Sequence, residues 1–505
     1  MNVEQIYKIS VRRQVIGRKG ALLTGVFLAP LLAAAVPDSA FAEDWRITPS
    51  IEFGESFTDN VNLTPTNRQS DWVQSIAPRL NFTATGPRIN ANITGGVDYL
   101  YFDRINEDDL RPYVLGTATI EAVPDLLRFN FQTEIQQTLL DPAGSFSISQ
   151  YNNTPNRDTV QLYSGGPTLY HHFGPIADAE LTYNFAYFTT NRFQTLTGQA
   201  PQQLNDTYLH EVTLLATSGP RFTNFLWQFD ANYSHSHAKN PLSVPPSIVN
   251  LEQAGFSFEG DYLVTNEFAL IAITGYDHIH DSTQTTPGVS LQGGFRYSGG
   301  FEVHGPRSSF RITAGRRFGG LAIDASATYR YSARTTMTAT YTDEVTTSVR
   351  RLNSLLGIAA NSNFADTFGL DPRFTLNDEL FRSRRGDLTL QADRGRNIFS
   401  VDGFVERRFY RIVPRGDWVY GGQTTWDRQL NRQWTWNATA LYTHQNFNNF
   451  VVRRDNIYAA SGGVKYQFAR SMSSSVTYRF SMRNSNDPLY DIKEHAVTLL
   501  LTAVF

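Results

Sequence analysis

The stretch Phe222-Thr-Asn-Phe-Leu-Trp-Gln-Phe-Asp-Ala-Asn-Tyr-Ser-His-Ser-His237 alternates between apolar and polar residues. One parity holds Phe225, Trp227, Phe229, Ala231 and Tyr233, and the other holds Asn, Gln and Asp. A period of two places these sets on opposite faces of a β-strand. The run exceeds the roughly five or six residues of a soluble strand and reaches the roughly ten that a tilted strand needs to cross a bilayer. The stretch therefore predicts a membrane-spanning strand.

The connections between such runs alternate in length. Short ones lie at Gly86-Pro87, Pro124-Asp125, Gly174-Pro175, Gly219-Pro220, Gly305-Pro306 and Gly395. Long polar ones lie at Thr58–Asp71, Leu140–Asp158, Gln194–Asp206, Ala238–Asn250, Thr346–Arg384 and Phe447–Asn456. Short periplasmic turns and long extracellular loops are typical of outer-membrane barrels. The sequence therefore predicts an all-β fold, a transmembrane antiparallel β-barrel of the outer membrane with roughly 22 strands, in a range of about 18 to 24.

Composition narrows the class of protein. The 505 residues include 41% hydrophobic and 13% aromatic side chains, no Cys, and a formal net charge of -3. Without Cys the chain has no disulfide, thiol nucleophile or covalently attached c-type haem. Disordered chains are poor in aromatic residues, and a transmembrane helix needs about 20 consecutive apolar residues, which the chain lacks after its N-terminal region.

The N-terminal region has the pattern of an export signal. Basic residues from Lys8 to Lys19 precede an uncharged stretch from Gly20 to Pro37, and Ala40-Phe41-Ala42 matches a signal-peptidase site. We expect a cleaved signal peptide over 1–42 and a single barrel domain over 43–505. The expected location is the outer membrane of a Gram-negative bacterium.

The C-terminal residues predict an assembly signal. One parity holds Val497, Leu499, Leu501, Ala503 and Phe505. A terminal strand with an apolar face that ends in Phe looks like the signal read by the outer-membrane assembly machinery. This strand must also close the barrel, because an open edge leaves backbone groups unpaired.

Three segments carry a family resemblance. They are Arg46-Ile-Thr-Pro-Ser-Ile-Glu-Phe-Gly-Glu-Ser-Phe-Thr-Asp-Asn-Val-Asn-Leu63, Thr85-Gly-Pro-Arg-Ile-Asn-Ala-Asn92, and Gly305-Pro-Arg-Ser-Ser-Phe-Arg-Ile-Thr-Ala-Gly-Arg-Arg-Phe318 with its continuation Tyr341–Thr347. They resemble outer-membrane β-barrel proteins associated with the PEP-CTERM/exosortase system, whose members look like exopolysaccharide-locus barrels. The chain has no PEP tripeptide followed by a C-terminal hydrophobic anchor, so it looks like an accompanying barrel and not a sorted substrate.

We expect a passive function, as a pore or assembly component associated with exopolysaccharide export or the matrix. Two alternatives stay open: a general small-solute porin, and a barrel sheath around a multihaem electron conduit. We expect no enzyme activity, no cofactor and no metal. The expected partners are outer-membrane lipid and lipopolysaccharide, the assembly machinery, and exopolysaccharide or its export proteins. A slightly acidic, exported chain is a poor binder of nucleic acid.

Several motifs have a chemical and a plainer interpretation. Tyr233-Ser-His235-Ser-His237 and Tyr276-Asp-His278-Ile-His280 have the i, i+2 spacing of a metal chelate, but on a lipid-facing parity they mark the aromatic girdle and headgroup zone. His280-Asp281-Ser282 has the residue types of a hydrolase triad, yet neighbouring strand residues point to opposite faces. Gly315–Gly320 lacks the Lys-Ser/Thr of a phosphate loop and predicts a tight hairpin.

Arginine pairs recur in or beside the expected loops, at Arg350-Arg351, Arg384-Arg385 and Arg453-Arg454. Arg binds phosphate and carboxylate groups in a bidentate manner. These pairs could hold lipopolysaccharide phosphates or an anionic polymer, or could form ion pairs within the loops.

Charge is divided between the two halves of the chain. Residues 43–260 hold 11 Lys+Arg against 23 Asp+Glu, a net of -12, whereas residues 261–505 hold 28 against 22, a net of +6. In a closed barrel these halves would become facing walls. The candidate pore-lining residues are Asp98, Glu134, Asp178, Glu180, Glu211 and Asp230 on the acidic wall and Arg311, Arg317, Arg330, Arg407 and Arg411 on the basic wall. Such walls predict weak ion selectivity that shifts toward cations when Arg311, Arg330 and Arg407 are neutralised; the alternative is that the imbalance sits in loops, where salt screens it within about 8 Å.

The segment Thr346–Arg384 is the longest break in the alternation. It contains Leu352, Leu355, Phe364 and Phe368, which a wholly solvated loop would not need. Long loops in compact domains are commonly functional. We expect this segment to fold over or into the pore mouth and to restrict conductance.

Overall fold

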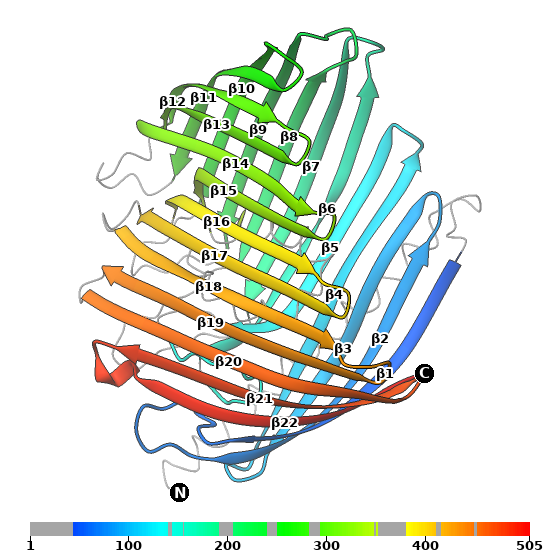
Figure 1. Cartoon of the computed structure of the whole chain (residues 1–505), viewed down its shortest axis with the longest axis vertical. Helices are drawn as coiled ribbons and strands as arrows, with labels where there is room; N and C mark the ends of the chain where they lie inside the picture. The colour runs from blue at the N-terminus through cyan, green and yellow to red at the C-terminus, as the bar shows by residue number, and fades with distance from the viewer. Residues whose placement is uncertain are drawn as a thin grey trace, which may run out of the picture.

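The chain folds as a closed antiparallel barrel (Figure 1). The computed structural model describes residues 44–139, 144–154, 156–190, 206–239, 250–281, 293–347, 350–351, 380–410, 416–448 and 452–505. Within them, 22 strands form one sheet, and β1 pairs with β22 to complete the ring. The predicted fold class and strand number are confirmed. The predicted signal peptide, Arg411 and most of Thr346–Arg384 lie outside the described residues.

The strands are long, from 10 residues in β13 to 18 in β20. Their bounds are β1 (Asp44–Thr58), β2 (Asp71–Thr85), β3 (Ile89–Phe102), β4 (Glu107–Val123), β5 (Leu127–Leu139), β6 (Arg157–His172), β7 (Ala177–Thr190), β8 (Thr207–Ser218), β9 (Phe225–Ala238), β10 (Asn250–Leu263), β11 (Phe268–Asp281), β12 (Gly294–His304), β13 (Ser308–Arg317), β14 (Gly320–Ser332), β15 (Thr335–Thr346), β16 (Phe381–Asp393), β17 (Asn397–Tyr410), β18 (Gly416–Gln429), β19 (Trp434–Asn448), β20 (Val452–Ala469), β21 (Met472–Ser485) and β22 (Ile492–Val504), with a 3-10 turn, η2 (Pro488–Tyr490), before β22. No helix in these parts of the chain is long and apolar enough to cross a membrane.

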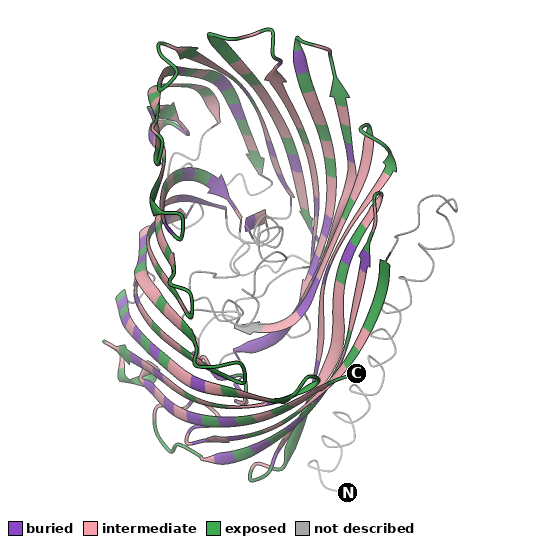
Figure 2. Ribbon diagram, turned by 45° about the vertical axis from the view of Figure 1, so that its right-hand side comes forward, coloured by how far each residue is buried: buried purple, intermediate pink, exposed green. Residues whose placement is uncertain are grey.

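The period-two pattern separates an outer face from an inner face. In β22, Val497, Leu499 and Leu501 are exposed on the outside of the barrel, whereas Glu494 and Thr498 are buried inside it. Exposed and buried residues alternate in the same way along other strands (Figure 2). A sheet closed into a ring must place one face outward and one inward, so each strand turns its apolar parity outward and its polar parity toward the lumen.

The two ends of the barrel differ. All the short connections named from the sequence lie at one end, together with the start of β1 and the end of β22. Gly174 and Gly395 adopt positive φ angles of 61° and 71° there, which a residue without a Cβ does at little cost. The other end carries most of the long connections. We call these the short-turn end and the long-loop end.

Of three expectations about the long-loop end, two need correction. Strand β16 already begins at Phe381, so the longest connection is 347–380. The predicted long loop at Phe447–Asn456 is wrong, because β19 and β20 occupy all of it except 449–451. The hairpin predicted at Gly315–Gly320 is confirmed, with Phe318 and Gly319 both at positive φ, 51° and 75°, as in the two-residue turns that match strand twist.

Candidate functional site

The lumen holds a segment of chain that folds inward from the long-loop end. This inner segment, residues 144–154, belongs to the connection between β5 and β6. Its buried residues include Phe146, Ser147, Ser149, Asn152 and Thr154. The sequence predicted a long polar extracellular loop at Leu140–Asp158, and the structure shows that 144–154 instead runs inward.

One end of the inner segment is held by β21 and β22. The buried Arg483 guanidinium donates to the Gly144 carbonyl, and the Ser481 hydroxyl accepts from the Ile148 amide at 3.1 Å. The Ser147 hydroxyl donates to Glu494, whose side chain is almost completely buried. A buried carboxylate needs such donors, because leaving it unpaired costs free energy.

The other end of the inner segment is held by β4, β6 and the connection between β1 and β2. Arg111, on β4, donates to the Gln150 carbonyl at 2.5 Å and to the Asn152 carbonyl at 3.2 Å. On β6, Arg157 donates to the Ser149 carbonyl at 3.0 Å. The Asn153 amide donates to the Val61 carbonyl at 2.8 Å. The segment therefore lies against the inner wall on both sides of the β1–β22 seam.

Two aromatic side chains add apolar contacts to these hydrogen bonds. Phe146 packs with Ile457 of β20, and Tyr151 packs against a cluster that includes Val61 and Phe102. The Tyr151 hydroxyl approaches β1 at Gly54, where an added Cβ would lie only 3.1 Å from it. Burial raises the pKa of the Tyr151 phenol above its ordinary value, so the group stays a hydrogen-bond donor.

The start of the long connection 347–380 also enters the lumen. Arg350 donates to Glu211 of β8 at 3.0 Å and to Gln253 of β10 at 2.8 Å. Its neighbour Arg351 donates to Glu406 of β17 at 2.8 Å and to Glu344 of β15 at 3.2 Å. Because β8 and β17 lie far apart around the ring of strands, two adjacent residues that bridge them must lie across the lumen. The part of Thr346–Arg384 expected to plug the pore lies outside the described residues, and its effect on conductance stays a prediction.

Glu406 is the centre of a buried ion-pair cluster. Its side chain has no exposed surface, and Arg351 and Arg408 each approach it at 2.8 Å. Arg385 lies 3.8 Å away, and the Ser383 hydroxyl donates to it at 2.9 Å. A buried carboxylate with several cationic donors holds its neighbours in one arrangement, because removing any partner leaves an unpaired charge.

Charges on β10 to β13 pair along one wall of the lumen. Arg311 lies 2.7 Å from Glu259 and 3.4 Å from Glu302, and Asp261 is 3.9 Å away. Arg317 makes two contacts of 3.1 Å with Asp277, as a planar guanidinium does with a carboxylate. These predicted basic residues therefore share a wall with carboxylates, which differs from the expected separation into an acidic and a basic wall.

The predicted acidic residues lie at several levels of the inner face. Asp98 pairs with Arg79, Glu134 accepts from Gln136, and Glu180 accepts from Thr182 at 3.2 Å. Glu211 binds Arg350 as described, and Asp230 lies on the inward parity of β9. Asp178 lies at the short-turn end, where it pairs with His172.

Two of the predicted basic residues do not join the paired lumen charges. Arg330 is exposed near the short-turn end of β14, on the inward parity. Arg407 faces outward, with its guanidinium carbon 4.4 Å from the ring centre of Phe409 and 5.1 Å from that of Trp418. Its expected place in the lumen is therefore corrected. Of the residues that bind Glu406, Arg351 belongs to one of the arginine pairs named from the sequence, whereas Arg408 was not singled out. The shared parity of Val405, Arg407 and Phe409 indicated that Arg407 faces outward.

The histidine motifs lie on the outer face of β9 and β11. Tyr233 and Tyr276 are exposed there, and His235 approaches Glu252 of β10 at 3.5 Å. Among the described residues no group of three or more His, Cys, Asp or Glu side chains is arranged to hold a metal ion. Ser282 of the third motif lies outside the described residues.

Comparisons with known proteins agree with this geometry. Residues 420–505 match the family model described as "Putative beta-barrel porin 2", and no curated protein matches the chain. The siderophore receptor PirA from Acinetobacter baumannii has a similar structure, with a TM-score of 0.50 and 9% identity over 91% of this chain and 80% of that one. The ferric-catecholate import receptor Fiu from E. coli gives a TM-score of 0.49 and 10% identity over 90% and 81% of the two chains.

The chain has the fold of an outer-membrane β-barrel. Identities this low show the fold alone. The family match covers part of β18 and all of β19 to β22, so this part of the chain resembles porin barrels. In such barrels the short turns are periplasmic and the long loops extracellular, and the two ends are named accordingly below.

Proposed function

We propose that this barrel is a passive outer-membrane pore whose extracellular half is narrowed by the inner segment 144–154 and by the turn at Arg350-Arg351. The single observation that carries this proposal is the inner segment, which lies inside a polar lumen and is held at both ends. A pore lining of charged and hydroxyl side chains suits hydrated solutes and excludes apolar ones. We further propose that it acts without enzymatic chemistry.

The proposed solute is a hydrophilic polymer or its fragments, in association with exopolysaccharide export and PEP-CTERM sorting. This part is supported by the sequence resemblance at Arg46–Leu63 and Gly305–Phe318. We also propose that β22, with its apolar outer face and Phe505, is read by the assembly machinery, and that the outer face contacts lipid and lipopolysaccharide. A small-solute porin and a sheath for a multihaem partner are the rival functions.

Planar-bilayer conductance of the purified full chain tests the pore. We expect small, stable conductance steps, since the lumen is partly filled, and a further decrease when neutral or anionic polysaccharide is added. No conductance in a folded sample would contradict the pore. Conductance unaffected by any polysaccharide would favour the small-solute porin.

A further inference from the structure

Arginines gather on one side of the periplasmic rim. Five consecutive periplasmic turns, from β12–β13 to β20–β21, carry exposed Arg307, Arg334, Arg394, Arg396, Arg432 and Arg470. These turns contain no Asp or Glu. The other five periplasmic turns hold Arg88 and Arg221 against Asp125 and Glu267, so their formal charges cancel. We call the six residues the arginine arc.

The arginine arc places much of the positive charge of residues 261–505 at the periplasmic rim, where the sequence had suggested a basic wall inside the lumen. Residues 261–505 have a net charge of +6, and the arc supplies six positive charges at the rim. Arg311, Arg317 and Arg351, in contrast, are neutralised by carboxylates within the lumen. Six positive charges of this half are therefore presented to the periplasm.

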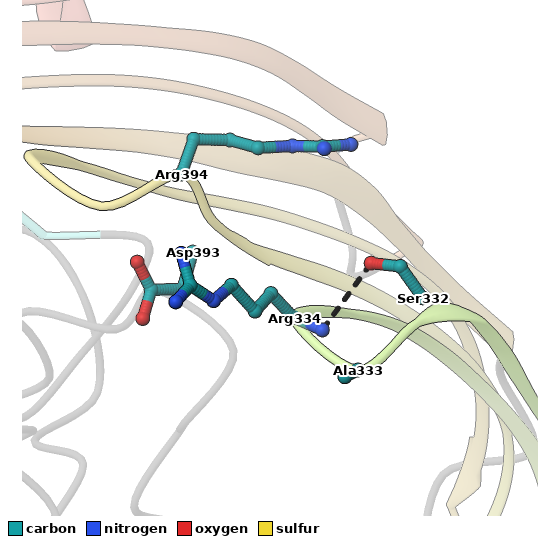
Figure 3. A pocket seen from close by; sticks show the side chains of 5 residues that line it. All are labelled: Ser332, Ala333, Arg334, Asp393 and Arg394. Atoms are coloured by element: carbon teal, nitrogen blue, oxygen red, sulfur yellow. Dashed lines mark hydrogen bonds between the residues drawn. The ribbon is translucent and has the colours of Figure 1, made fainter.

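The described residues include all ten periplasmic turns. Among them, no arginine of the arc forms an ion pair with a carboxylate. Figure 3 shows a shallow hollow between two of these turns, lined by Ser332, Ala333, Arg334, Asp393 and Arg394. The Asp393 carboxylate, at the end of β16, accepts from the Gly395 amide at 2.9 Å. Among the described residues, the Arg396 guanidinium donates only to the Leu430 carbonyl, at 3.5 Å. The guanidinium groups remain available to an external anion.

The spacing of the arc suits an extended protein surface. Neighbouring strands lie about 4.8 Å apart, so successive periplasmic turns are about 10 Å apart and five of them cover about 40 Å. Lipid headgroups surround a barrel on all sides and would meet all ten turns alike. A charge confined to five consecutive turns instead favours a partner that approaches from one side.

We propose that the arginine arc docks the acidic face of a periplasmic protein beside the mouth of the lumen. The proposal rests on the outer-membrane orientation but not on the identity of the solute. Arg is suited to this role because its planar guanidinium binds carboxylates in a bidentate manner and is always charged. Charge complementarity of this kind speeds encounter and fixes orientation, and it weakens as salt is added.

Fluorescein-labelled poly-L-glutamate is a suitable probe, with the full chain in nanodiscs of zwitterionic phosphatidylcholine. We expect binding that weakens steeply with salt, and about tenfold weaker binding for the variant Arg394→Gln/Arg432→Gln. The matched control Arg88→Gln/Arg221→Gln removes the same charge from the opposite side of the rim and should change affinity less than about twofold.

Equal weakening by the two double variants would overturn the proposal, because the arc would then be no more than part of a diffuse basic rim. A second outcome would also overturn the proposal. If the chain does not bind polyglutamate but binds phosphatidylglycerol vesicles, and both double variants lose that binding equally, then the arginines bind lipid. Conductance recorded on the same samples separates this test from that of the pore, since none of the four substituted residues lines the inner face.

Discussion

Removing two of the three arginines that hold the inner segment should open the pore. Arg111 makes two hydrogen bonds to carbonyls of the segment, and Arg483 makes one. Hydrogen bonds to a charged donor contribute about 1.5 kcal/mol or more each, so the variant Arg111→Gln/Arg483→Gln loses about 4.5 kcal/mol of docking free energy. That loss lowers the ratio of docked to undocked segment about a thousandfold.

Single-channel recording in planar bilayers measures the result. We expect the variant to show larger conductance steps than the wild type, and new protease cleavage within 144–154, while the barrel stays folded by heat-modifiable gel mobility. The control Arg128→Gln/Arg330→Gln removes two inward-facing arginines that do not contact the segment. A folded variant with unchanged conductance and no cleavage would refute the view that the segment narrows the pore.

Three other perturbations test different parts of the barrel. The variant Arg311→Gln/Arg317→Gln leaves lumen carboxylates uncompensated, so the reversal potential in a salt gradient should show greater selectivity for cations. Arg407→Gln should leave the selectivity unchanged, because Arg407 faces outward. An unchanged selectivity in the first variant would mean that this wall does not line the permeation path. Glu406→Gln leaves buried arginines without their carboxylate and should lower the free energy of unfolding by about 3 kcal/mol in denaturant titrations, and a loss below about 1 kcal/mol would contradict the cluster's role. Phe505 is 77% exposed as a whole residue, and its amide donates to the Pro49 carbonyl at 2.9 Å. Its deletion should reduce the amount of folded protein in outer-membrane fractions, and an undiminished yield argues against a terminal signal.

The barrel could be predicted from the sequence because its determinants are local. Alternation in a run such as Phe222–His237 fixes the faces of a strand, and turns such as Gly305-Pro306 fix where strands reverse. Strand number follows by counting. Each of these signals is contained within about 20 residues, so no distant contact can change it.

The lumen could not be predicted in the same way. Residues 144–154 are mostly Ser, Asn and Gln, which are typical of a solvated loop, and the groups that bury them are far away in sequence. Ser147 and its partner Glu494 are separated by 347 positions. The expected separation into acidic and basic walls was wrong for a related reason. The net charge of each half of the chain does not say whether an Arg pairs with a neighbouring strand, as Arg311 does with Glu302, or projects from a turn, as Arg334 does.

The inner segment also bears on how the ring closes. Thr58 of β1 donates to Glu494 of β22 at 2.7 Å across the seam, a contact between residues 436 positions apart, and Ser147 binds the same carboxylate from the inside. Joining such distant positions carries a large loop-closure entropy, which must be lost before the contact forms. Residues 144–154 connect β5 to β6, yet Ser147 reaches the carboxylate that Thr58 binds at the seam. The inner segment therefore acts as a clasp on the closed ring, and each of the two contacts makes the other less costly to form.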